Sequence, residues 1–181
     1  MDERKLVKIS KYLSKHLRHQ EERSGLILEN GGWVNVEDLL KAAARNNFPI
    51  SVTELKEVVE KNDKKRFSFD ESGIKIRANQ GHSVAVDLNL KPQIPPATLY
   101  HGTAERNANS IKEHGLLKMA RHHVHLSIDA ETARRVGARH GKPLIFKIDT
   151  AAMTAENFEF FVSENGVWLT ENVPPKFLDI L

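Results

Sequence analysis

Three prolines within six residues divide the chain near its middle. The stretch Lys91–Pro96 lacks several backbone donors and favours extended backbone, so neither a helix nor a central strand is expected to continue through it. A length of 181 residues is enough for one domain or for two small ones. We therefore predict two lobes, residues 1–93 and residues 97–181.

The composition excludes several classes of protein. With 40% apolar residues, 28% charged residues and a net charge of +3, the chain is too apolar and too weakly charged to be disordered. It contains no run of about 18 apolar residues that could cross a membrane, and its charged opening residues are unlike a secretory leader. The absence of Cys excludes disulfides, thiolate zinc sites and cysteine nucleophiles. A cytoplasmic protein is expected.

The first lobe has the pattern of three helices followed by a hairpin. Apolar residues recur every three or four positions and predict a helix over 3–19. Two shorter helices are predicted to begin at the capping residues Asn35 and Ser51, the first of them after a strand at 33–34. Alternating residues around a turn predict a hairpin over 66–77. This order is typical of a winged helix, a fold that binds DNA, RNA or only proteins.

The second lobe has the pattern of short strands interrupted by helices. The predicted strands are 99–103, 124–127, 144–148 and 166–169, and the predicted helices are 107–114 and 129–140. Glycines at 115 and 141 are expected to end the two helices. The pattern indicates a compact α+β lobe.

The first helix carries a basic stripe opposite its apolar side. Its members are Lys8, Lys11, Lys15, Arg18 and His19. Such a stripe is most often a solvated helix face. Arg66, however, lies on a strand that could pack on this helix and approach Arg18. Two guanidinium groups and an imidazole suit a phosphate, because each guanidinium can donate two parallel charge-assisted hydrogen bonds.

Two His-x-Ser/Thr patterns occur in the second lobe. They are His101 with Thr103 and His125 with Ser127, and in each the two side chains share one side of a strand. Scattered surface histidines would explain either pattern alone. Together they are also compatible with a metal-free cyclic phosphodiesterase in which histidines act as general acid and base. A zinc site at His122, His123 and His125 has no carboxylate at metal-binding spacing.

A cluster of basic residues lies on the predicted helix 129–140. It comprises Arg134, Arg135, Arg139 and His140. Arg135 and Arg139 are four residues apart and would share a helix face. The cluster could be surface charge or could hold a pyrophosphate. The chain has neither a Gly-x-Gly-x-x-Gly nor a Walker loop, so neither Rossmann-type nor P-loop nucleotide binding is supported.

These motifs resemble those of the RNA 2′-phosphotransferase family, also called tRNA 2′-phosphotransferases, over nearly the whole chain. The matching segments are 10–19, 32–34, 65–67, 76–83, 99–103, 123–127, 136–143 and 165–170. The resemblance implies a winged-helix RNA-binding lobe followed by an ADP-ribosyltransferase-like lobe that binds NAD. It also implies a tRNA-like substrate, a role in tRNA splicing, and no metal, membrane or obligate protein partner.

The family's reaction removes an internal 2′-phosphate from RNA in two steps. The phosphate first attacks the nicotinamide ribose C1″ of NAD, releasing nicotinamide and leaving ADP-ribose on the RNA phosphate. The ribose O2″ then attacks the phosphorus, which yields 2′-OH RNA and ADP-ribose 1″,2″-cyclic phosphate.

The resemblance also implies roles for individual residues. The family's catalytic tetrad corresponds to Arg18, His19, Arg66 and Arg139. The 2′-phosphate would be bound by Ser14, Lys15, Arg18, His19 and Arg66. NAD would be bound by His101, Gly102, Thr103, Ser110, His125, Ser127, Arg139 and Val167. The aliphatic Val167 stands where polymer-forming relatives carry Glu, which argues against polymer synthesis.

Two alternatives to this function remain at the level of the sequence. A cyclic phosphodiesterase would open cyclic phosphates without NAD, and Arg139 would matter little to it. A winged-helix RNA-binding protein with a degenerate second lobe would hold RNA and form no product.

Overall fold

A computed structural model describes residues 1–19, 25–62, 65–82 and 88–181. The chain divides into two compact units, Met1–Asn89 and Leu90–Leu181. Each unit has its own apolar core and contains both helices and strands, so the protein is α+β. Within the described segments, no helix combines the length and the apolar character needed to span a bilayer.

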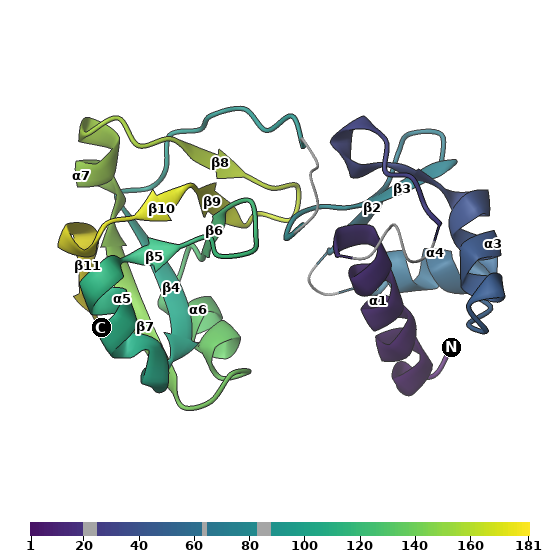
Figure 1. Ribbon diagram of the computed structural model, residues 1–181, viewed down its shortest axis with the longest axis horizontal. Coiled ribbons are helices and arrows are strands. Elements are labelled where there is room, and N and C mark those ends of the chain that lie inside the picture. The colour runs from purple at the N-terminus through teal and green to yellow at the C-terminus, as the bar shows by residue number, and fades with distance from the viewer. Residues whose placement is uncertain (20–24, 63–64, 83–87) are drawn as a thin grey trace. The chain divides into compact units, whose positions relative to one another are not determined.

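The first unit combines helices with a small antiparallel sheet (Figure 1). Its helices are α1 (Glu3–Arg18), α3 (Val36–Arg45) and α4 (Val52–Glu60), and its strands are β1 (Val34–Asn35), β2 (Phe67–Phe69) and β3 (Lys75–Ala78). The strand order is β1-β3-β2. The predicted helices and hairpin are confirmed, and the predicted strand at 33–34 begins one residue later.

Side-chain caps explain where these helices begin. The Asp2 side chain accepts from the backbone N–H of Lys5 at 2.7 Å, which caps α1. Ser51 and Glu54 form a complete capping box at the start of α4, as their spacing predicts. Each cap satisfies backbone donors that a helix cannot bond internally.

The apolar side of α1 is buried against α4 and β3. Leu13 and Leu17 are fully buried in the first core, whereas Lys11 and Lys15 on the other side of the helix are exposed. The basic residues therefore remain at the surface because burial of the apolar side fixes the rotation of the helix.

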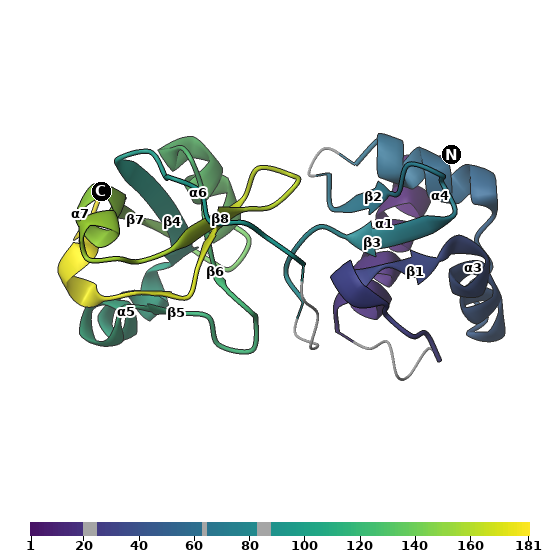
Figure 2. The ribbon, with the colours of Figure 1, turned by 90° about the horizontal axis from the view of Figure 1, so that it is seen from above.

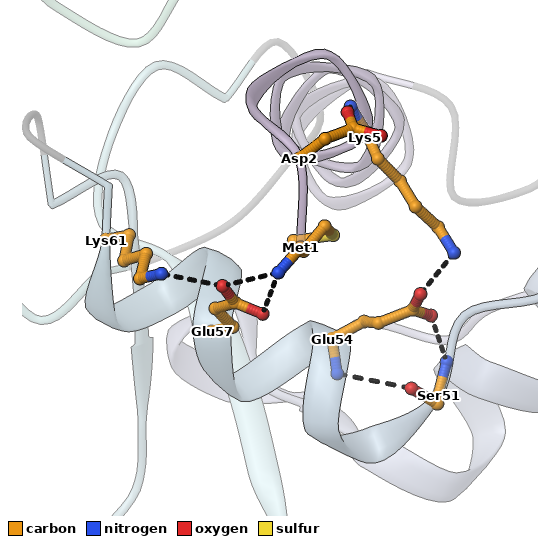
Figure 3. A network of polar contacts seen from close by, with 7 residues as sticks. All are labelled: Met1, Asp2, Lys5, Ser51, Glu54, Glu57 and Lys61. Atoms are coloured by element: carbon orange, nitrogen blue, oxygen red, sulfur yellow. Dashed lines mark hydrogen bonds and ion pairs between the residues drawn. The ribbon is translucent and has the colours of Figure 1, made fainter.

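Ion pairs join the start of α1 to α4 (Figure 3). The amino group of Met1 lies 3.0 and 3.2 Å from the two carboxylate oxygens of Glu57, and Lys61 Nζ donates to the same carboxylate at 2.7 Å. Lys5 pairs with Glu54. The hydrogen bond from Lys61 is the main reason why the pKa of Glu57 is lowered.

The Lys5–Glu54 pair predicts a pH-dependent stability. Donation from Lys5, and then from the Ser51 backbone, lowers the pKa of Glu54 from 4.5 to about 2. The stabilisation is therefore present above pH 4.5 and is lost as the pH falls toward 2. We expect Glu54→Gln, which keeps an acceptor for Ser51, to lower the free energy of unfolding at pH 7 by about 0.5 kcal/mol. Urea unfolding at several pH values measures this.

The same experiment on the exposed Glu60 provides the control. Glu60→Gln should change the free energy of unfolding little at any of these pH values. A Glu54→Gln deficit that persists undiminished near pH 2 would contradict the assignment of the effect to the ionised carboxylate.

The Trp33 ring supports β3 of the first unit. The guanidinium carbon of Arg77, on β3, lies 4.5 Å from the centroid of the Trp33 ring. Arg77 Nη1 donates to the carbonyl of Gly31 at 3.3 Å. The contact ties β3 to the 3₁₀ turn Asn30–Gly32, which precedes β1.

The second unit is built from strands of two to seven residues and α-helices of six to eight residues (Figure 1). In chain order the elements are β4 (Thr98–Ala104), α5 (Ala108–His114), β5 (Leu116–Leu117), β6 (Val124–Leu126), α6 (Ala130–Gly137), β7 (Pro143–Asp149), α7 (Thr150–Ala155), β8 (Phe160–Val162), β9 (Trp168–Thr170), β10 (Asn172–Val173) and β11 (Leu178–Ile180). The sheets have the orders β11-β7-β4, β6-β9-β8 and β10-β5. A bridge between Tyr100 and Ser127 joins β4 to the end of β6.

Two predicted elements of this unit have different bounds. The predicted helix 129–140 ends at Gly137, and Arg139 donates its backbone N–H to Val136 in a turn. The expectation that Arg135 and Arg139 share a helix face is therefore wrong. The predicted strand 166–169 begins instead at Trp168, because Gly166 (φ 75°) forms the turn before it.

The backbones of α6 and β4 are in direct contact (Figure 2). A Cβ added at Gly102 would lie 1.6 Å from the carbonyl oxygen of Ala133, and one added at Gly137 would lie 2.7 Å from that of Thr103. Only glycine permits this approach. The contact fixes the end of α6 on β4, and Arg139 follows two residues later.

Candidate functional site

The predicted phosphate-binding residues of α1 lie in its last turns. Ser14 is half-buried and Lys15 is exposed. Arg18 is the last helical residue, and His19 follows as the C-terminal cap with an exposed side chain. Cationic groups are favourable at this end of a helix because of its dipole.

The Arg18 guanidinium is held against the hairpin. Its central carbon lies 5.9 Å from the centroid of the Phe67 ring on β2. Its Nη1 atom lies 3.6 Å from the position that a Cβ would take at Gly81. The Nε and Nη2 atoms are shielded from solvent. Arg18 is thus a partly desolvated cation next to the strand that follows Arg66.

Arg66 lies in a groove beside α1. The groove has a volume of about 550 Å³, and its lining residues are Glu3, Leu6, Val7, Ser10, Lys11, Ser14, Lys61, Asn62 and Arg66. Ser14 and Arg66, predicted from distant segments of the chain, therefore face the same groove. Three of the lining side chains are cationic and one is acidic, which favours an anionic ligand.

Asn62 connects Arg66 to α1. Its Oδ1 atom accepts from Arg66 Nη1 at 3.4 Å, and its Nδ2 atom donates to Ser10 Oγ at 3.2 Å. Asn62 is 5% exposed, so this amide is part of the packed structure. Sequence reasoning missed both Asn62 and Ser10, because no spacing rule relates residues that are far apart in the chain.

The two predicted histidines lie on neighbouring strands of the second unit. His101 is on β4 and His125 on β6, and His101 Nδ1 lies 3.0 Å from the carbonyl oxygen of His125. Burial lowers the pKa of His101, and the Arg121 charge lowers it further, whereas the hydrogen bond from Nδ1 opposes these effects. The net effect favours the neutral form of the ring.

Ser127 lies beside these histidines. Backbone hydrogen bonds of 2.9 and 2.7 Å connect Ser127 to Tyr100, the neighbour of His101. The structure thus brings His101, His125 and Ser127 together on neighbouring strands. Val167 directly precedes β9, the strand that pairs with β6, and its carbonyl accepts from the backbone N–H of Ser163 at 3.0 Å.

Thr103 and Ser110 are placed differently from one another. Thr103 is buried on β4, and its Oγ1 accepts from Asn107 Nδ2 at 3.0 Å. This bond ties the start of α5 to β4. Ser110 is exposed one turn later on α5.

Arg139 lies in the second unit, whereas the other three residues of the predicted tetrad lie in the first. It is exposed in the turn between α6 and β7. Its position next to β4 follows from Gly137, whose backbone contacts Thr103.

The histidines that follow β5 are not arranged as metal ligands. The His123 ring packs on Phe161 with the centroids 5.5 Å apart, and desolvation lowers its pKa. Across segments 1–19, 25–62, 65–82 and 88–181, no three His, Cys, Asp or Glu side chains converge on a point that could hold a metal ion.

The side chains around His101 suit a ligand with hydroxyl and amide groups. Imidazole nitrogens and the hydroxyls of Thr103 and Ser127 can both donate and accept hydrogen bonds. A ribose diol or a carboxamide requires this combination, and both occur in NAD. The donor set therefore fits NAD.

Comparison with known proteins decides the family. A family model described as "RNA 2'-phosphotransferase, Tpt1 / KptA family" matches residues 4–172. The chain belongs to this family. The match spans both units, and it makes the protein a transferase.

Curated members of the RNA 2′-phosphotransferase family are similar to the chain over its full length. The protein of Trichormus variabilis is 59% identical over 181 residues, covering 100% of both chains. The proteins of Streptomyces griseus and Herpetosiphon aurantiacus are each 58% identical over 98% of both chains. All three bear the name "Probable RNA 2'-phosphotransferase".

Proposed function

We propose that this transferase removes an internal 2′-phosphate from RNA and uses NAD as the acceptor. In this proposal the first unit, a winged-helix lobe, binds the RNA phosphate. The second unit, an ADP-ribosyltransferase-like lobe, binds NAD. Two observations support the proposal: Ser14 and Arg66 both line the groove beside α1, and the chain belongs to this family.

The first unit supplies what a phosphate nucleophile requires. A 2′-phosphate already carries negative charge, so its attack needs no general base and depends on binding and orientation. Arg66 and Arg18 donate from guanidinium groups whose planes can match two phosphate oxygens. Ser14, Lys15 and His19 add a hydroxyl, an ammonium and an imidazole at the same end of α1.

The second unit supplies hydrogen-bonding groups for NAD. When bound, NAD offers an electrophilic C1″ with nicotinamide as leaving group and then a 2″-hydroxyl that displaces the RNA 2′-oxygen, forming ADP-ribose 1″,2″-cyclic phosphate. His101, Thr103, His125 and Ser127 would orient the dinucleotide, with Gly102, Ser110 and Val167 beside it. Arg139 would neutralise charge on the pyrophosphate or on the transferred phosphate.

Nicotinamide release tests the proposal directly. We expect the protein to release nicotinamide from NAD only when an oligonucleotide with an internal 2′-phosphate is present. The products identified by mass spectrometry should be 2′-OH RNA and ADP-ribose 1″,2″-cyclic phosphate. The matched control is the same oligonucleotide with a 2′-hydroxyl.

Two other outcomes would contradict the proposal. Opening of a 2′,3′-cyclic phosphate without NAD would identify a phosphodiesterase instead. Binding of RNA without any product would identify a binding protein.

Activity should persist in a chelator, because in this proposal cationic side chains neutralise the phosphate.

A further inference from the structure

The Nδ1 atoms of His101 and His125 have hydrogen-bond partners of opposite kind. A backbone carbonyl can only accept a hydrogen bond, so His101 Nδ1, which is 3.0 Å from the carbonyl oxygen of His125, must carry the hydrogen. In the neutral ring this leaves a lone pair on Nε2. His101 therefore offers an acceptor at Nε2.

His125 has the opposite arrangement because its partner is Arg121. Arg121 Nη1 lies 3.1 Å from His125 Nδ1. A guanidinium can only donate, so Nδ1 of His125 must be the acceptor and the ring hydrogen must lie on Nε2.

The segment that carries Arg121 is held on both sides. The backbone N–H of Arg121 donates to the carbonyl of Lys118 at 3.0 Å, and Lys118 pairs with Glu171. Two residues after Arg121, the His123 ring packs on Phe161. The segment that presents the guanidinium to His125 is thus anchored, although the Arg121 side chain itself is exposed.

We propose that Arg121 is a positioning residue that fixes His125 as the Nε2–H tautomer, so that His125 offers a hydrogen-bond donor where His101 offers an acceptor. One donor and one acceptor on neighbouring strands suit a group that both donates and accepts, such as a ribose diol or a carboxamide. The identity of this ligand rests on the proposed function, whereas the assignment of the tautomers is independent of it.

Nitrogen NMR of the full chain tests the tautomers without any ligand. In protein labelled with ¹⁵N-histidine, long-range ¹H–¹⁵N spectra distinguish protonated from unprotonated ring nitrogens. We expect His125 to be protonated at Nε2 and His101 at Nδ1. In Arg121→Ala, His125 should become a mixture of tautomers, whereas His101 should keep its pattern and show that the strands remain paired.

Two further variants sharpen the NMR experiment. Arg121→Lys keeps a donor and should restore part of the Nε2–H population of His125. Arg45→Ala removes an exposed arginine of the other unit and should leave both histidines unchanged. A His125 protonated at Nδ1 in the parent protein, or an unchanged His125 in Arg121→Ala, would overturn the proposal.

Kinetics then connects the tautomer to the ligand. We expect Arg121→Ala to raise the KM for NAD about 5- to 10-fold, because one oriented hydrogen bond to NAD would be lost. The change in kcat should be smaller, and the KM for RNA should not change. A raised KM for RNA alone would make Arg121 an RNA contact and would contradict the positioning role. Absence of NAD-dependent activity in the parent protein would refute the proposed function and leave the NMR result intact.

Discussion

Gly102→Ala is expected to destabilise the second unit more than any other substitution considered for this protein. The new Cβ would lie 1.6 Å from the carbonyl oxygen of Ala133, and a backbone atom cannot move aside without shifting α6 from β4. We expect the free energy of unfolding to fall by ~4 kcal/mol or more, which is at the upper end for single substitutions. Thermal unfolding followed by circular dichroism measures it.

Two other glycines separate crowding from backbone conformation. Gly137→Ala would be stabilising by helix propensity alone, yet its Cβ would lie 2.7 Å from the carbonyl oxygen of Thr103, so we expect destabilisation. Gly166 has open space around it but a φ of 75°, so Gly166→Ala should cost only about 1–2 kcal/mol. A Gly102→Ala protein that melts within a few degrees of the parent would contradict the close approach of α6 and β4.

Loss of any tetrad arginine is expected to reduce turnover by two orders of magnitude or more. In the proposed site, Arg18→Ala, Arg66→Ala and Arg139→Ala would each remove a charge-assisted anchor for a phosphate, and loss of one such donor typically costs about 10²- to 10³-fold in rate. The measurement is nicotinamide release at saturating NAD and RNA.

Controls distinguish lost chemistry from lost packing. Arg18 packs against Phe67, so Arg18→Ala also removes an apolar contact. Arg18→Lys retains the side-chain stem and the charge but cannot donate in parallel to two oxygens, and it should also be strongly impaired. Arg45→Ala should turn over at the parental rate. Near-parental rates in all three alanine variants would refute the assignment of these arginines.

The first unit was largely predictable because its signals are local. The capping box of Ser51 and Glu54 and the apolar spacing along α1 require only neighbouring residues, and both are present in the structure. The link from Arg66 through Asn62 to Ser10 was not predictable, because it depends on how α1 packs against the segment before β2.

The second unit was predicted less completely for the same physical reason. Strand β4 and the strand that carries His125 followed from local patterns, whereas the contact of His101 with His125 depends on how the two strands are placed. The short helix α7, capped by Asp149, and the strands β5, β8, β10 and β11 were missed, because elements of two to six residues carry little periodic signal. The early end of α6 depends on the contact of Gly137 with β4, which no helical pattern contains.

The two tryptophans of the chain are divided between the units, and this gives each unit its own optical reporter. Trp33 lies beneath the Arg77 guanidinium, and Trp168 packs against the second core. Replacing either indole by phenylalanine would leave a single tryptophan, in the other unit, whose emission can be excited selectively over that of tyrosine. Fluorescence of the two variants could then follow the unfolding of each half separately.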